Sequence, residues 1–279
     1  AIWVDSGASQ SGKGTFDRPF DTIDYAVGRC TANNGDIIMV KAGHTETVSA
    51  AAGLDLDVAG IAIIGLGTGS LRPTIDFTTV VGADMDVDAA NISVFNLLFT
   101  GGFDALTGPI DINAADFSML NCETRDVTGQ ATDFIVTDAN ADRLLIQNHI
   151  HRGAAAAGAD TWISIVGGDD ITIIPAFIDG NFAVAAIENV DTAAVNLQIF
   201  GSANYPAYLR TRNNADVIVT CVATTTGRQG PFLNARLNQD EANITEAFVG
   251  AAMEFFQPIN IVNADGQSSM QTNITASTD

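Results

Sequence analysis

Positive charge is the scarcest property of this 279-residue sequence. Lysine and arginine together number 12, and only Lys13 and Lys41 are lysines, whereas 33 residues are acidic. The formal net charge is therefore −21 at pH 7. A chain with this charge repels phosphate backbones, so we expect no nucleic-acid partner. The acidity favours a well-solvated surface.

Cysteine is almost as scarce. Cys30, Cys122 and Cys221 are odd in number, far apart and not arranged as C-x-x-C. This pattern argues against a disulfide framework and against a zinc site. We interpret each cysteine as a small buried hydrophobic residue of a protein that folds in a reducing cytoplasm.

Long apolar runs are missing, although 47% of the residues are hydrophobic. No stretch approaches the roughly 20 apolar residues that a membrane-spanning helix needs. The first residues also lack a basic segment followed by an apolar one, so we expect neither a secretion signal nor a membrane partner.

The sequence does contain an internal repeat. The stretches "LDLDVAGIAIIG", "MDVDAANISVFN" and "IDINAADFSMLN" resemble one another, and alternating apolar triplets recur in this and later parts of the chain. The steps between triplets are 31, 25, 27, 27, 26 and 20 residues. The triplets begin at Ile61, Ile92, Phe117, Leu144, Ile171, Leu197 and Val217.

A repeat of this length predicts a solenoid. Propeller blades need units of about 40 residues, and the L-x-x-L-x-L pattern of leucine-rich repeats is missing. Each unit contains two or three short segments with period-two alternation, separated by Gly, Asn or Asp. We therefore predict an all-β fold, a single-stranded right-handed parallel β-helix.

Asparagine recurs in register with the triplets. Asn96, Asn121 and Asn148 each lie four residues beyond a triplet start, where the other units carry Gly65, Pro175 or Gly201. Parallel coils lie about 4.8 Å apart, a spacing that lets stacked amides bond to one another. We predict such a ladder rather than unrelated turn residues.

The same stacking predicts two columns of outward carboxylates, because alternate side chains of a strand face opposite ways. Leu54, Leu56, Met85, Val87, Ile110 and Ile112 are expected to face inward. Two interpretations of the columns stay open: a hydrated face that blocks aggregation, or a face that binds Ca²⁺, the one cofactor considered. The outward residues are Asp55, Asp57, Asp86, Asp88 and Asp111.

Three regions are expected along the chain: an N-terminal segment with a capping helix (1–34), the β-helix (35–227) and an irregular β region for capping and association (228–279). In "FDTIDYAVGRC", Ile23, Ala26, Val27 and Cys30 fall on one helical face, with Asp21 as N-cap. Four arginines near the C-terminal region are expected to pair with carboxylates of a neighbouring subunit or coil. They are Arg210, Arg212, Arg228 and Arg236.

The middle coils change character. The positions expected to face outward become Ile135, Thr137, Trp162 and Ser164. An exposed tryptophan among apolar neighbours predicts a contact surface, either for another subunit or for a loop of the same chain.

Nearby, His149 and His151 are separated by one residue and are expected on an outward face. They could share a metal, but no third ligand lies close in the sequence, so ordinary surface histidines are the alternative interpretation.

Residues 12–48 resemble the N-terminal segment of pectin-lyase-like β-helix proteins. The shared pattern is G-T…P-F-x-T-I…A followed by G-D-x-I-x-V-x-x-G, here "GTFDRPFDTIDYA" and "GDIIMVKAG". The resemblance implies the fold and no particular activity. The enzymes of this fold mostly cleave polysaccharides, but their N-T-D, G-H-G, R-I-K and W-x-D-H motifs are missing, and "GGDD" at 167–170 is best interpreted as a turn.

The acidic coils rich in Ala, Asn and Thr, such as "DFIVTDANADRLLIQN", are similar to β-helix proteins among the virion structural proteins of tailed phages. This resemblance implies a non-enzymatic virion protein, a capsid decoration protein or a head- or tail-associated fibre. Its partners would be copies of itself, in a homotrimer, and the major capsid protein or another virion protein, assembled in the host cytoplasm. The alternatives are a polysaccharide lyase or hydrolase, such as a tailspike, and a glycan-binding module.

Overall fold

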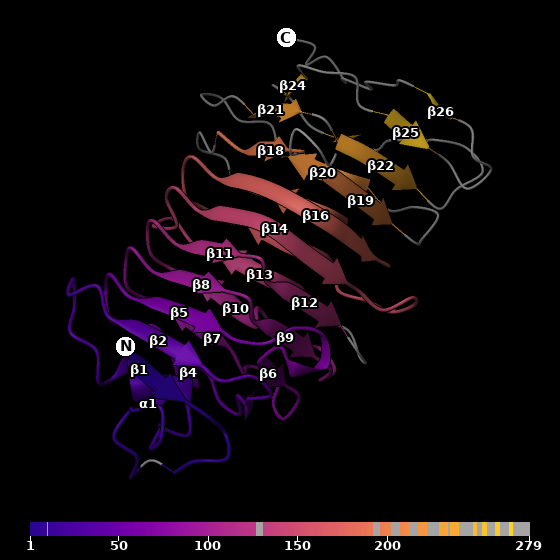
Figure 1. Ribbon diagram of the computed structural model, residues 1–279. Coiled ribbons are helices and arrows are strands. Elements are labelled where there is room, and N and C mark those ends of the chain that lie inside the picture. The colour runs from indigo at the N-terminus through magenta and orange to yellow at the C-terminus, as the bar shows by residue number, and fades with distance from the viewer. Residues whose placement is uncertain are drawn as a thin grey trace.

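The chain winds into a column of stacked coils (Figure 1). This computed structural model describes residues 1–9, 11–126, 131–191 and 196–201 in full and, beyond residue 201, the backbone of eight strands. β1 lies near one end of the column, and later strands follow in order along it. Neither of the two short helices among the described residues is long and apolar enough to cross a membrane.

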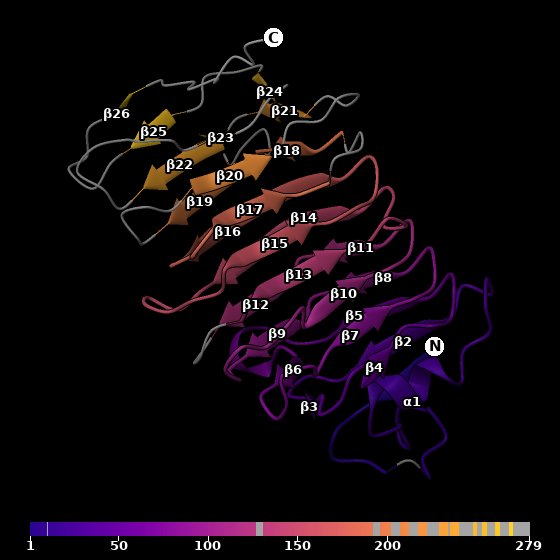
Figure 2. The same ribbon diagram turned by 180° about the vertical axis from the view of Figure 1, so that it is seen from behind.

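Two sheets run along the column, and the smaller one faces the viewer in Figure 2, where the molecule is seen from behind. Every described pairing is parallel except that of β25 with β26. The smaller sheet contains β4 (Leu54–Asp55), β7 (Met85–Val87), β10 (Ile110–Ile112), β13 (Asp133–Thr137), β15 (Thr161–Ile165), β17 (Ala185–Asn189), β20 (Val217–Cys221) and β23 (Phe248–Val249).

The larger sheet has 18 strands. Up to residue 201 they are β1 (Ile2–Val4), β2 (Ile37–Val40), β3 (Thr45–Thr47), β5 (Ala62–Gly65), β6 (Thr74–Phe77), β8 (Ser93–Phe95), β9 (Leu98–Gly101), β11 (Ser118–Leu120), β12 (Glu123–Asp126), β14 (Leu145–Arg152), β16 (Thr172–Gly180) and β18 (Gln198–Phe200). The remainder are β19 (Ala207–Thr211), β21 (Gln229–Leu233), β22 (Ala235–Gln239), β24 (Met253–Phe255), β25 (Asn260–Val262) and β26 (Ser268–Ser269).

The apolar triplets explain why the coils stack in this register. One inward column consists of the third residue of each triplet, and these residues are at most 2% exposed. This finding confirms the predicted parallel β-helix. The column reads Ile63, Val94, Met119, Ile146, Ile173 and Ile199, each paired with the next.

The seventh triplet was assigned wrongly. Val217 begins β20, which pairs with β17 in the smaller sheet, whereas Ile199 of the larger sheet pairs with Phe232. The coil at this point is longer than 27 residues, so a fixed period leads to the wrong strand. Parallel pairing also continues beyond Gly227, where β21 pairs with β24 and β22 with β25.

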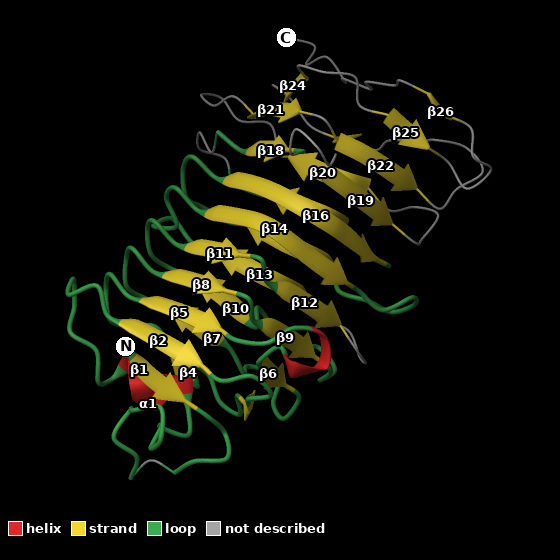
Figure 3. Ribbon diagram, viewed as in Figure 1, coloured by secondary structure: helices red, strands yellow, loops and turns green. Residues whose placement is uncertain are grey.

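A short helix, α1 (Ile23–Val27), lies at the N-terminal end (Figure 3). As predicted, Ile23, Ala26 and Val27 are fully buried, and the helix packs against β1, β2 and β4. The N-cap is Thr22 rather than Asp21, because the Thr22 hydroxyl accepts the Tyr25 N–H at 3.2 Å. The second helix is a single 3-10 turn, η1 (Gly69–Leu71).

The predicted asparagine ladder is present. The Asn148 amide donates to Asn121 Oδ1 at 2.8 Å, and the Asn121 amide approaches Asn96 Oδ1 at 3.5 Å. Asn96 closes the ladder by donating to the carbonyls of Gly65 and Gly67, both at 2.9 Å. All three asparagines have positive φ, between 52° and 56°, a conformation that asparagine tolerates better than most residues.

The thiols agree with the sequence interpretation where they are described. Cys122 is buried, Cys30 is half-buried, and both are free. Burial raises the pKa of Cys122 to about 12 and that of Cys30 to about 11, so both stay protonated at neutral pH. The side chain of Cys221 lies outside the described residues.

Candidate functional site: a carboxylate face and an arginine cluster

The aspartates of the repeat form the predicted outward columns, which we call the carboxylate face (Asp55, Asp57, Asp86, Asp88 and Asp111). Asp55 pairs in register with Asp86, and Asp86 with Asp111. Their strand neighbours confirm the alternation, because all are at most 1% exposed. These inward residues are Leu54, Leu56, Met85, Val87, Ile110 and Ile112.

Stacking brings the like-charged aspartates of the carboxylate face close together, so they repel one another. Partial burial, reinforced by the charges of Asp88 and Asp111, raises the pKa of Asp86 to about 6. Burial first, and then neighbouring carboxylates, also raise the pKa values of Asp55 and Asp111. Direct relief comes from Asn113, whose amide donates to Asp86 Oδ1 at 2.5 Å and to Asp88 Oδ1 at 3.2 Å.

The calcium interpretation of the carboxylate face (Asp55, Asp57, Asp86, Asp88 and Asp111) stays a prediction. Within the described ranges, no group of three or more His, Cys, Asp or Glu side chains is arranged to hold a metal ion. The register places one aspartate of a column on each coil, about 4.8 Å from the next.

His149 and His151 do not lie on the surface as expected, because both are fully buried. The Thr124 hydroxyl bonds to His149 Nε2 at 2.9 Å and to His151 Nδ1 at 2.8 Å. Burial lowers the pKa of His151 to about 3 and that of His149 well below its usual value, so both imidazoles are neutral. A neutral pair fits this geometry, since the hydroxyl can donate to one ring and accept from the other.

The prediction that Trp162 forms an exposed contact surface is wrong. Its side chain is 0% exposed, with ring centroids 5.3 Å from His149 and 6.4 Å from His151. Ile135 and Thr137, also expected outside, pair with the inward residues Ile110 and Ile112.

The register explains the error at Ile135 and Thr137. Val136, not Ile135 or Thr137, continues the outward position of Asp111, so the assumed alternation was shifted by one residue. Ser164, which pairs with Val136, does continue that outward position, but it is only 4% exposed.

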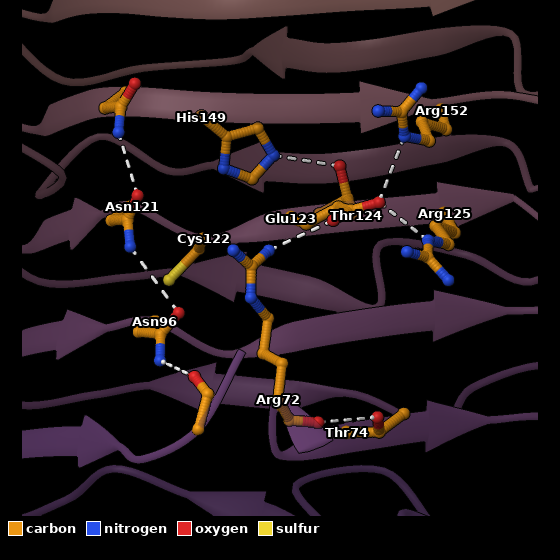
Figure 4. Close-up of polar contacts among 12 residues, drawn as sticks. Arg72, Thr74, Asn96, Asn121, Cys122, Glu123, Thr124, Arg125, His149 and Arg152 are labelled. Atoms are coloured by element: carbon orange, nitrogen blue, oxygen red, sulfur yellow. Dashed lines mark hydrogen bonds and ion pairs between the residues drawn. The ribbon is translucent and has the colours of Figure 1, made fainter. Parts of the chain in front are cut away.

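An arginine cluster, defined as Arg72, Arg125 and Arg152 around Glu123, was not predicted (Figure 4). Glu123 Oε1 accepts from Arg125 Nε at 2.7 Å and from Arg152 Nε at 3.2 Å, and Oε2 accepts from Arg72 Nη1 at 3.0 Å. Glu123 is only 7% exposed, which strengthens these interactions. Three guanidinium groups contact this one carboxylate, and Asp179 on the next coil pairs in register with Arg152.

Three different coils supply the cluster. Arg72 follows η1, Glu123 and Arg125 lie on β12, and Arg152 ends β14. Arg125 pairs in register with Arg152, 27 residues later, which is the step between the triplets at Phe117 and Leu144. That spacing was a usable sequence signal. The contact between Arg72 and Glu123 could not be predicted in this way, because Arg72 lies in a turn outside the repeat.

The other arginines named from the sequence cannot be placed in a site. The side chains of Arg210, Arg212, Arg228 and Arg236 lie outside the described residues. Asp169 and Asp170 are exposed in the turn before β16, as their turn interpretation requires, and Asp170 has a φ of 58°.

Comparisons with protein-family models, with curated proteins and with solved structures found no match for this chain. The fold and the two charged surfaces therefore stand on the sequence and the geometry alone.

Proposed function

We propose that the protein is a non-enzymatic structural protein of a virus particle, a decoration protein of a tailed-phage capsid or a short fibre on its head or tail. The observation that carries the proposal is the continuous register of the coils. Inward columns, backbone ladders and the asparagine ladder all repeat from coil to coil. A column held in this way is a stiff element with several charged lateral faces, which suits assembly.

The proposed partners are further copies of the chain, in a homotrimer, and the major capsid protein or another virion protein. The proposed location is the virion, assembled in the host cytoplasm. The assignment follows from the resemblance of the acidic coils to phage virion proteins that we draw from the sequence. Free, high-pKa thiols are compatible with assembly in a reducing compartment.

Cryo-electron microscopy of intact particles that carry the chain tests the proposal. We expect density for the coil column at ordered positions on the head or tail. In parallel, the purified full chain is incubated with pectin, polygalacturonate and capsular polysaccharides, and no new reducing or unsaturated ends are expected. Cleavage that is abolished by Asp86→Asn or Asp88→Asn would overturn the structural assignment.

One observation favours a second candidate, a glycan-cleaving enzyme. Asp104 and Asp160 line the same hollow of about 250 Å³, together with Ala105 and Thr132. Glycoside hydrolysis uses two carboxyl groups on either side of the scissile bond. If this hollow is catalytic, Asp104→Asn and Asp160→Asn should each abolish cleavage in the same polysaccharide assay, while the stability of the column to urea changes little.

A further inference from the structure

The arginine cluster and the carboxylate face share one axial spacing. Arg125 and Arg152 are paired on adjacent coils, and so are Asp86 and Asp111. Each pair therefore spans one coil step of about 4.8 Å. The spacing between the two positive charges matches the spacing between the two negative charges.

The two surfaces also lie at the same height along the column. Asp111 on β10 and Arg125 on β12 belong to one coil, because β10, β11 and β12 follow each other in sequence and pair with β7, β8 and β9. They lie in different sheets, which Figures 1 and 2 show from opposite sides. One molecule cannot bring its own two surfaces together, but a second copy beside it can.

The arginine cluster offers positively charged hydrogen-bond donors, and the carboxylate face offers negatively charged acceptors. Arg125 and Arg152 use Nε to hold Glu123, and Figure 4 shows their other guanidinium nitrogens pointing away from it. Both side chains are about half exposed, at 43% and 55%. Beside them, Ile150 and Phe177 continue the outward column above Glu123 and are half-buried, which provides apolar surface that an interface would cover.

We propose that a second copy of this chain docks side by side with the first, with the arginine cluster of one copy against the carboxylate face of the next. The inference rests on the proposed structural function, which it deepens by naming the surfaces that join the subunits. The two surfaces differ, so the contact is head-to-tail around the assembly. Because they lie at one height, successive copies are related with little shift along the column, and the assembly is a closed ring if the rotation between copies closes.

Salt dependence gives the first test. Two copies of this acidic chain repel at long range, but this repulsion is screened beyond about 8 Å at physiological ionic strength. We therefore expect association, measured by sedimentation velocity of the full chain from 10 mM to 1 M NaCl, to be strongest near 0.15 M and weaker at both extremes. A monomer throughout, or association that rises steadily with salt as an apolar contact would, overturns the proposal.

Neutralising variants give the second test. Asp86→Asn with Asp111→Asn removes charge from the carboxylate face without removing an inward side chain, and Arg125→Gln with Arg152→Gln does the same for the arginine cluster. Each pair should weaken association at least about ten-fold, which corresponds to about 1.4 kcal/mol. The matched control, Asp17→Asn with Asp169→Asn, removes two charges from exposed aspartates elsewhere and should leave association unchanged.

Zero-length cross-linking gives the third test and does not depend on how strongly the variants associate. Arg125→Lys with Arg152→Lys retains the charge and adds amines that a carbodiimide can join to carboxylates. In a mixture of ¹⁴N- and ¹⁵N-labelled protein, mass spectrometry should find mixed-isotope links from residues 125 or 152 to Asp86, Asp88 or Asp111. Links to Glu123 within one copy are expected in either case, because Glu123 contacts both positions. The absence of mixed-isotope links, or mixed-isotope links only to other carboxylates, overturns the proposal.

The same variants separate this inference from its alternatives. If Arg125→Gln with Arg152→Gln leaves association intact but abolishes binding of polygalacturonate, the arginine cluster binds an acidic glycan and the self-association inference fails. If association follows the predictions but intact particles lack the chain, the virion assignment fails and the interface stands.

Discussion

The first coils and the middle coils differ in where their unfavourable polar side chains lie. In the first coils these side chains lie outside the column, and in the middle coils several of them lie inside it. In the first coils, from β4 to β10, the interior is apolar and like-charged aspartates stack outside. In the middle coils, from β12 to β16, Thr124 and two histidines occupy the interior, and the outer Glu123 is fully paired with arginines. In the first coils, most of the carboxylates face solvent. In the middle coils, the polar side chains are paired with one another by hydrogen bonds.

This difference shows what a parallel stack does to its side chains. Parallel register places each side chain beside the side chain at the same position on the next coil. Where the residue type repeats, an unfavourable interaction such as repulsion between carboxylates repeats from coil to coil, unless the neighbouring coil supplies a different group. Asn113 does so above Asp88, and Arg125 and Arg152 do so beside Glu123. Four changes test the contrast between the two regions.

The largest effect is expected inside the first coils. Val87→Asp places a carboxylate where the side chain is 0% exposed and where no polar partner is described. Burial of an unpaired charge should lower the free energy of unfolding by more than about 4 kcal/mol, or prevent folding. Urea denaturation followed by circular dichroism measures the change. Asp88→Asn, one residue away but outward, is the control and should stay within about 0.5 kcal/mol of the wild type.

The interior of the middle coils should be sensitive to acid. The pKa of His151 is about 3 in the folded protein and 6.5 as a reference, so the unfolded state binds the proton first as the pH falls. His151 alone should therefore remove about 3 kcal/mol of stability between pH 7 and pH 4. We expect His151→Gln, which cannot titrate, to lose less stability over this range in urea titrations. Equal losses in the two proteins would argue against a buried neutral imidazole.

The outer pairing of the middle coils should contribute less. Glu123→Gln leaves three guanidiniums around a neutral amide, and we expect the free energy of unfolding to fall by about 2 kcal/mol at pH 7. Asp116→Asn is the matched control, because it removes a carboxylate that pairs with Arg143 at 2.7 and 2.8 Å on the exposed surface. Exposed ion pairs contribute little, so this control should hardly change the urea midpoint. Similar losses for both variants would remove the distinction between buried and exposed pairing.

The smallest effect is expected outside the first coils and has the opposite sign. Asp86→Asn should raise the stability of the monomer at pH 7 by about 1 kcal/mol, after allowance for solvent screening of this partly exposed group. The pKa of Asp86 is raised to about 6, so the folded protein retains the proton more strongly and the wild type gains stability as the pH falls through 6. The advantage of the variant should thus vanish below about pH 4. An advantage that is independent of pH would have another cause.

Several elements of the fold were predictable because they are local or repeat at a fixed step. The apolar triplets, the asparagines four residues beyond them and the alternating aspartates place side chains inside or outside without knowledge of distant segments. The apolar face of α1 was predictable for the same reason. Prediction failed at Val217, where the coil lengthens, and at Ile135, where the alternation was shifted by one residue.

The candidate site was predictable only in part. The carboxylate face follows from the repeat, and the 27-residue step from Arg125 to Arg152 could have revealed half of the arginine cluster. The contact between Arg72 and Glu123 joins residues 51 positions apart, and the former lies in a turn with no counterpart in other coils. Burial of His149, His151 and Trp162 depends on contacts between residues of different coils, which no short stretch encodes.

By itself, therefore, the sequence determined the parallel coil architecture, the inward aliphatic columns of the first coils and the stacked aspartates, since each depends only on alternation and period. Only the tertiary structure decided which polar residues enter the interior and which arginines meet Glu123. Those outcomes depend on distances between residues on different coils and on access to water, and both arise only after the chain has wound.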